Sequence, residues 1–276
     1  DWNLSKDHPA ASSSDIDYLL GHVNSVLNEP ITRDDIQGVY AGLRPLLAGE
    51  DEATSKLSRE HAVSTAVKGL VVIAGGKYTT YRVMAKDAVD AAVEVMGVLM
   101  ERKVPPCCTE NVPLIGADGY EALWNQRHHL ATQHGLSVSR IEHLLNRYGA
   151  LALEVLALIA DKADLGQPLE NAEDYLRAEV VYAASHEGAR HLEDFIARRS
   201  HISIETAHRG ALVVEEVAKL MGKELGWSRK QRAAEIEHYR KRVEAELHSQ
   251  TMPDDETADA ARMGAADVVP IDRSQH

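Results

Sequence analysis

The chain has 276 residues and a formal net charge of −13, so it is long enough to bury the core of one large domain or two modest ones. Its content of 44% hydrophobic and 26% charged residues is ordinary for a soluble globular protein. The acidic balance argues against a nucleic-acid-binding protein, because phosphate affinity depends on clustered Lys and Arg. A small anionic ligand is not excluded, since a local cationic pocket can exist in an acidic protein.

The first predicted elements mix helix and strand. Apolar residues at helical spacing predict a helix over residues 14–28. We then expect a strand at 36–43, a short strand at 57–63, and a buried strand at 69–76, whose β-branched run is bounded by glycines. A strong helical pattern follows over residues 79–100. This part of the chain therefore has an α+β character.

The rest of the chain is predicted to be helical. Three prolines make residues 104–116 the best linker in the sequence. The apolar stretches beyond it are interrupted by charges and are typical of core helices rather than membrane spans. Residues 250–276 are small, acidic and weakly apolar, which predicts a disordered tail. The candidate helices run near 118–133, 138–147, 149–161, 172–185, 190–198, 204–224 and 228–248.

The most informative motif is GLVVIAGGKYTTYR, in which a strand ends in Gly75 and Gly76 and a helix begins about three residues later. This arrangement brings backbone N–H groups and the positive end of a helix close to a ligand, and glycine is needed where a Cβ would block the approach. Lys77 adds a mobile cation. The local pattern alone also fits a tight strand–helix turn in any α/β protein. It is not a phosphate-binding P-loop, because Tyr78 stands where that motif requires Ser or Thr.

Two arginines are the other candidates for ligand binding. Arg44 precedes Pro45 in GVYAGLRP, so its backbone is held extended and its side chain can be aimed from a strand end. A guanidinium recognises phosphate or carboxylate with two parallel hydrogen bonds. Arg59, in TSKLSREH, is a weaker candidate by itself. On local grounds alone, both arginines are better interpreted as solvated surface charges, Arg59 more so than Arg44.

Other site types fail on spacing. His191 lies five residues after His186, whereas a zinc-binding H-E-x-x-H motif needs four, so we expect no metal site. The two cysteines, Cys107 and Cys108, are adjacent, and we expect them to be reduced thiols in an intracellular protein. The sequence contains no G-x-G-x-x-G dinucleotide fingerprint.

Together the motifs resemble a known family. GVYAGLRPLL, TSKLSREH and GLVVIAGGKYTTYRVMAKDAVDA, in this order and spacing, are similar to the C-terminal half of FAD-dependent glycerol-3-phosphate dehydrogenases. The segment AEVVYAASHEGARHLEDFIARRSHISIETAHRGALVVEEVAKLMGKELGW is similar to the helical C-terminal domain of that family. The resemblance covers residues 1 to about 248, and three motifs with a helical domain in the right order are highly specific.

The resemblance implies residues 1–103 as the C-terminal part of the FAD- and substrate-binding oxidoreductase domain. The linker at 104–116, an all-α C-terminal domain at 117–249 and the tail at 250–276 would follow. The family's N-terminal portion, which carries the dinucleotide-binding glycines, is not found here. We therefore expect this polypeptide to be a C-terminal fragment that, by itself, binds FAD poorly and does not turn over.

The implied activity is oxidation of sn-glycerol 3-phosphate to dihydroxyacetone phosphate, with FAD as hydride acceptor and a quinone as electron acceptor. By resemblance, Arg44 and Arg59 would bind the phosphate and hydroxyl region of the substrate. Gly75, Gly76, Lys77, Tyr78 and Thr79 would line the flavin ring. The resemblance further implies a cytoplasmic homodimer, with peripheral contact at the inner face of the cytoplasmic membrane.

Two alternatives stay open. A glycerol-3-phosphate oxidase, which passes electrons to oxygen, shares these motifs. A non-catalytic helical interaction module, with residues 118–248 docking a partner, would also suit amphipathic helices with an acidic exterior. The second alternative does not explain why two arginines and a glycine–lysine turn precede the helices.

Overall fold

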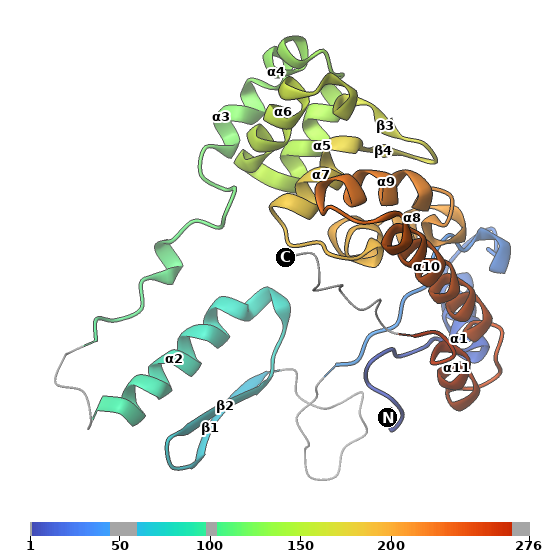
Figure 1. The fold of residues 1–276 in the computed structure, drawn as a ribbon. Coiled ribbons are helices and arrows are strands. Elements are labelled where there is room, and N and C mark those ends of the chain that lie inside the picture. Colours follow the sequence, from blue (N-terminus) through green and yellow to red (C-terminus); the bar gives the residue numbers. More distant parts are fainter. Residues whose placement is uncertain (1, 45–59, 98–103, 267–276) are drawn as a thin grey trace. The chain divides into compact units, whose positions relative to one another are not determined.

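The computed structural model describes residues 2–44, 60–97 and 104–266 and divides into two units (Figure 1). The smaller unit comprises residues 1–3 and 43–114, and the larger comprises residues 4–42 and 115–276. The larger unit is therefore built from two separate stretches of chain. In the structure, residues 4–42 pack with the helical part, and the assignment of residues 1–103 to the oxidoreductase domain stays a prediction.

The smaller unit is a β-hairpin with one helix. Strands β1 (His61–Val67) and β2 (Leu70–Gly75) pair antiparallel, with His61 opposite Gly75. Helix α2 (Tyr81–Gly97) packs against both strands. The strand predicted at 57–63 overlaps β1 at residues 61–63, and residues 57–59 lie outside the described part of the chain. The second strand was expected to be buried, and this was wrong: the Leu70 and Val72 side chains are exposed.

The larger unit is mainly helical (Figure 1). Ser228 illustrates how the sequence sets a helix start: the Ser228 hydroxyl accepts a hydrogen bond from the Gln231 amide at 3.1 Å, at the start of the helix predicted near 228–248. The helices are α1 (Ser13–Asn24), α3 (Tyr120–Asn125), α4 (Arg127–His134), α5 (Val138–Tyr148), α6 (Ala152–Asp161), α7 (Arg177–Ser185), α8 (Ile202–Glu205), α9 (Val214–Glu224), α10 (Arg229–Ser249) and α11 (Asp255–Arg262).

Two apolar clusters form the core of this unit. One gathers side chains from α7, α9, α10 and the π-helical turn at Asp194–Arg199, and Phe195 and Met221 are fully buried within it. The other gathers side chains from α4 to α7, with Ile141 and Leu156 at its centre. Residues 138–161 are long and apolar enough, by length and composition, to cross a membrane. Their burial in the second cluster shows that here they act as core helices.

Three predicted elements of the larger unit were wrong. Residues 36–42 form neither strand nor helix. The helix expected over 172–185 begins only at Arg177, because β4 (Ala172–Leu176) pairs antiparallel with β3 (Pro168–Leu169). The helix expected over 204–224 is interrupted at Ala207–Gly210, where the backbone turns left-handed.

The expected disordered tail also differs from the structure over its first half. Asp254 caps α11 by accepting a hydrogen bond from the Thr257 amide at 2.8 Å. The helix packs on α10, and Ala258 is completely buried. In the N-terminal part of the sequence, the Ser13 amide donates to the Met252 carbonyl at 2.7 Å. This bond joins α1 to the segment between α10 and α11. Residues 267–276 lie outside the described part of the chain.

Candidate functional site

The glycine–lysine turn sits between β2 and α2, as the motif predicted. Gly75 and Gly76 have φ values of 75° and 83°, in the left-handed region that favours glycine. Lys77 is extended, and a single 3-10 turn, Tyr78–Thr80, leads directly into α2. The Thr80 amide and hydroxyl donate to the Lys77 carbonyl at 3.0 and 3.1 Å, which closes the turn.

Gly76 lies where a side chain would displace its neighbour Met84. A Cβ at this position would lie 2.5 Å from the Met84 sulfur and 3.2 Å from the His61 Cβ. The His61 ring is itself fixed to α2, because its Nε2 lies 2.8 Å from Oδ2 of Asp87. The end of β2 is therefore held tightly against both β1 and the first turns of α2.

The far side of this turn is open to solvent. Lys77, Tyr78 and Thr79 are all exposed, and the Tyr78 side chain is 89% exposed. The Tyr78 and Tyr81 rings stack with centroids 5.8 Å apart. The first N–H groups of a helix have no partner within the helix, and they carry partial positive charge. The turn thus presents a cation, helix-start N–H groups and an aromatic face to an approaching planar anionic ligand.

The structure describes one of the two candidate arginines. Arg44 is exposed at the end of the described segment 36–44. Arg59 lies outside the described residues. Their convergence with Lys77 on one substrate therefore stays a prediction, as does the role of the five residues Gly75 to Thr79 in lining a flavin.

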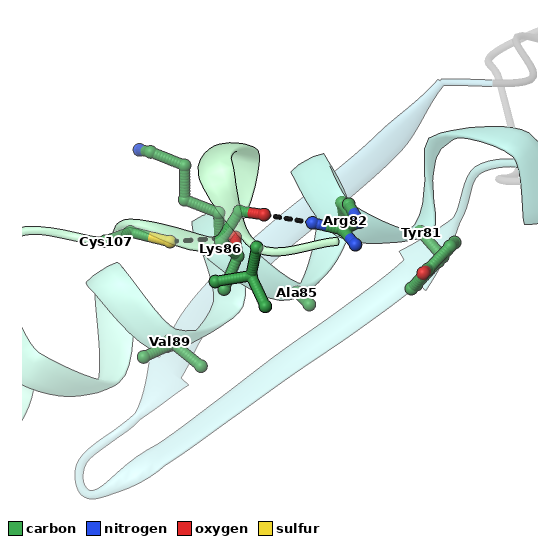
Figure 2. A pocket seen from close by; sticks show the side chains of 8 residues that line it. Tyr81, Arg82, Ala85, Lys86, Val89 and Cys107 are labelled. Atoms are coloured by element: carbon green, nitrogen blue, oxygen red, sulfur yellow. Dashed lines mark hydrogen bonds between the residues drawn. The ribbon is translucent and has the colours of Figure 1, made fainter. Parts of the chain in front are cut away.

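A second feature of the smaller unit was not anticipated from the sequence. A cavity of about 320 Å³ lies between α2 and the segment after it (Figure 2). Tyr81, Ala85 and Val89 line it at successive helical turns, a four-residue spacing that the sequence does contain. The Arg82 guanidinium donates to the Thr109 carbonyl at the cavity wall. The full lining is Tyr81, Arg82, Ala85, Lys86, Val89, Cys107, Thr109 and Val112.

Cys107 borders this cavity (Figure 2). Its sulfur lies 3.1 Å from the Thr109 hydroxyl. Hydrogen bonds from the Thr109 side chain and backbone lower the pKa of the Cys107 thiol, and the charge of Lys86 acts in the same direction. Cys107 is thus a chemically distinct thiol beside an apolar cavity.

Comparison with known proteins indicates the family. Residues 107–232 match the C-terminal domain of alpha-glycerophosphate oxidase. Glycerol-3-phosphate dehydrogenase 2 of Mycobacterium tuberculosis is 55% identical over 265 residues, which are 96% of this chain. Over nearly its whole length, the chain is similar to members of the glycerol-3-phosphate dehydrogenase family. The resemblance inferred from the motifs is confirmed, as is the fold class of an α+β part with a helical C-terminal domain.

More distant members of the glycerol-3-phosphate dehydrogenase family agree. A probable mitochondrial glycerol-3-phosphate dehydrogenase of Caenorhabditis elegans is 34% identical over 246 residues, which are 87% of this chain. The X-ray structure of the glycerol-3-phosphate dehydrogenase from Bacillus halodurans, complexed with FAD, superimposes with a TM-score of 0.66 at 23% identity. It covers 88% of this chain and supports the fold. The chain spans 45% of the length of its Mycobacterium tuberculosis relative and 47% of the Bacillus halodurans protein.

Proposed function

We propose that this chain supplies part of the flavin and substrate site of an FAD-dependent glycerol-3-phosphate dehydrogenase. The reaction is oxidation of sn-glycerol 3-phosphate to dihydroxyacetone phosphate. The names of the mycobacterial and Caenorhabditis elegans relatives support this activity, and the FAD complex of the Bacillus halodurans protein supports the cofactor. The structural observation that carries the proposal is the left-handed Gly75–Gly76 turn that places Lys77 at the start of α2.

The residues of this turn fit a flavin ring. Because Gly76 has no side chain, the backbone at this position packs closely against Met84 and His61. Lys77 and Tyr78 are exposed beside it and can contact a ligand without first breaking a buried interaction. When bound, FAD supplies the hydride acceptor for oxidation of the secondary alcohol of the substrate.

The chain's own groups act by placing charge. The Lys77 ammonium and the N–H groups that open the 3-10 turn put positive charge at the site where negative charge accumulates on hydride transfer. Little rearrangement of the turn is needed to stabilise this negative charge, because the Thr80 hydrogen bonds to the Lys77 carbonyl fix the turn before a ligand binds. Arg44 and Arg59 bind and orient the substrate phosphate through charge-assisted hydrogen bonds.

We extend the proposal to the electron acceptor and the assembly. A quinone accepts the electrons, and the enzyme is a cytoplasmic homodimer that touches the inner face of the membrane. An oxidase that reduces oxygen is the second candidate, since the matching domain is described as that of alpha-glycerophosphate oxidase. A quinone-analogue dye assay run beside a peroxide assay separates the two, because only the oxidase produces peroxide in step with substrate.

The substrate assignment is tested in the longer enzyme that the proposal implies. Arg44→Ala and Arg59→Ala should each weaken binding of sn-glycerol 3-phosphate by about 1.5–3 kcal/mol, roughly 10- to 150-fold, if each makes a charge-assisted phosphate contact. Arg240→Ala is the matched control, since Arg240 makes an exposed ion pair with Glu215. Unchanged binding in both test variants would show that the site is elsewhere.

A further inference from the structure

The backbone at His208, Arg209 and Gly210 is unusual. All three residues have positive φ values, of 53°, 54° and 72°. Only glycine adopts this region without a steric penalty, so the surrounding structure must hold His208 and Arg209 in place. Strained backbone of this kind gathers at positions where a side chain has to be aimed in one direction.

Two contacts from α10 hold Arg209. The Tyr239 hydroxyl donates to the Arg209 carbonyl at 2.6 Å. The Arg209 Nη2 lies 2.6 Å from Oε1 of Glu246, and only 11% of the arginine side chain is exposed. Because the guanidinium is planar and rigid, fixing Nη2 on Glu246 also fixes the direction of Nη1.

Nη1 points to the segment that precedes Arg44. It donates to the Val39 carbonyl at 2.6 Å. One residue earlier, Gly38 lies against the backbone of α8, where a Cβ would come within 2.6 Å of the Ile204 Cα. Arg209 and Ile204 therefore hold residues 38 and 39 on the helical unit from two sides.

A hollow lies beside this attachment. A cavity of about 350 Å³ is lined by the segment 34–39 together with residues 207–209, Leu247 and Gln250. Its walls include Gln37 and Val39 on one side and Leu247 and Gln250 on the other. Residues 36–39 form neither strand nor helix, and the Arg209 bond to Val39 joins two residues that line this cavity.

Val39 precedes Arg44 by five residues. Five residues of extended chain span at most about 17–18 Å, so fixing Val39 limits where the Arg44 side chain can be. Pro45 restricts Arg44 further to an extended backbone. We propose that Arg209 is a positioning residue, which holds the Val39 carbonyl and thereby places Arg44 for the substrate phosphate. This inference rests on the proposed function.

The experiment uses the full-length dehydrogenase with the variants Arg209→Lys and Gly38→Ala. Lysine keeps the positive charge beside Glu246, but it lacks the planar guanidinium that contacts Glu246 and the Val39 carbonyl at the same time. Gly38→Ala disturbs the other contact without touching Arg209. Both should raise the KM for sn-glycerol 3-phosphate at least about tenfold while kcat changes less than about twofold, since only substrate placement is affected. Arg240→Ala, an exposed arginine in the same unit, is the control and should change neither constant.

A second readout is independent of turnover. Hydrogen–deuterium exchange of the amides of residues 36–44 should become faster in both variants, whereas exchange in α5 and α6 should not change. Unchanged exchange at 36–44, or faster exchange there with an unchanged KM, overturns the positioning role. A general loss of protection across α9 and α10 with a fall in kcat also overturns it, because that outcome marks a purely structural residue.

The variant Arg44→Ala tests the proposed substrate site separately from the positioning role of Arg209. If Arg44→Ala weakens binding and the Arg209 and Gly38 variants do not, only the positioning inference fails. If Arg44→Ala has no effect, the proposed substrate site itself is wrong. A raised KM in all three variants, with faster exchange at 36–44 in the two positioning variants, supports both.

Discussion

The Nδ1 atom of His191 lies 2.8 Å from Oε1 of Glu235, whose side chain on α10 is 1% exposed. The Leu192 amide donates to the other oxygen of the same carboxylate at 3.3 Å. Glu235 therefore fastens the segment before the π-helical turn to the long helix α10. The hydrogen bond to Glu235 is the main cause that raises the pKa of His191 above its ordinary value of 6.5, against the opposing effect of burial.

The His191 contact predicts a pH-dependent stability. A raised pKa in the folded state means that the stabilisation is complete below about pH 6.5 and is lost as the pH rises through the folded-state pKa. The variant His191→Asn should therefore lose more stability relative to the original chain at about pH 5.5 than at about pH 8.5. Urea denaturation at both pH values measures the two differences. Equal differences would show that the histidine does not titrate with folding.

Glu246 should be a stability determinant of the larger unit. Its two carboxylate oxygens lie 2.6 Å from Arg209 and 3.1 Å from Arg262, and all three side chains are largely buried. Removal of the negative charge by Glu246→Gln leaves two buried guanidiniums without it and should cost about 3 kcal/mol of unfolding free energy. Glu215→Gln, at the exposed pair with Arg240, should cost less than about 0.5 kcal/mol. Similar losses at both positions would contradict the burial argument.

Gly76 should resist substitution for two separable reasons. Gly76→Ala adds backbone strain and a Cβ beside Met84, whereas Gly69→Ala adds the strain alone, because φ is +81° there and no atom lies within 4 Å. We expect Gly69→Ala to cost about 1 kcal/mol and Gly76→Ala about 2 kcal/mol or more. Shortening the neighbour in a Gly76→Ala, Met84→Ala double variant should recover part of the difference. Thermal or chemical denaturation measures these three variants and Met84→Ala alone, and the steric account fails if the double variant shows no recovery relative to the sum of its two single changes.

Cys107 should react with alkylating agents before Cys108. Exposure alone predicts the opposite order, since Cys108 is exposed and Cys107 only partly so. The Thr109 hydrogen bonds lower the pKa of Cys107 and raise its thiolate fraction near neutral pH. Iodoacetamide labelling followed by mass spectrometry of the Cys107→Ser and Cys108→Ser variants gives the two rates separately. Thr109→Val should slow labelling of the remaining Cys107, and faster labelling of Cys108 would disprove the prediction.

Local signals predicted the parts of the fold that local forces determine. The strand–Gly75–Gly76–helix turn was found where the sequence placed it, because glycine flexibility and a change of apolar period are both readable along the chain. The start of α10 at Ser228 was equally predictable, because its capping residues are close together in the sequence. These are also the features that carried the family resemblance.

The errors share a non-local cause. Residues 36–42 have strand-like composition, but the Val39 carbonyl accepts its bond from Arg209, 170 residues away. Helix α11 looked like a tail because its anchor, the ion pair of Arg262 with Glu246, joins residues on two different helices. The expected helix from 204 fails at His208 and Arg209, whose left-handed backbone depends on α10. None of these partners is visible in a window of neighbouring residues.

The bond between the Ser13 amide and the Met252 carbonyl has a consequence for synthesis in the cell. The larger unit joins residues 4–42 to residues from 115 onward, which are synthesised later, with the hairpin unit emerging between them. At ordinary rates of about 5–20 residues per second, the early piece waits roughly 10–50 seconds for its partner. During that interval Ile16 of α1, which is buried in the folded chain, is without the late segment that α1 joins at Ser13. Nascent chains of this protein should therefore be natural clients of ribosome-associated chaperones.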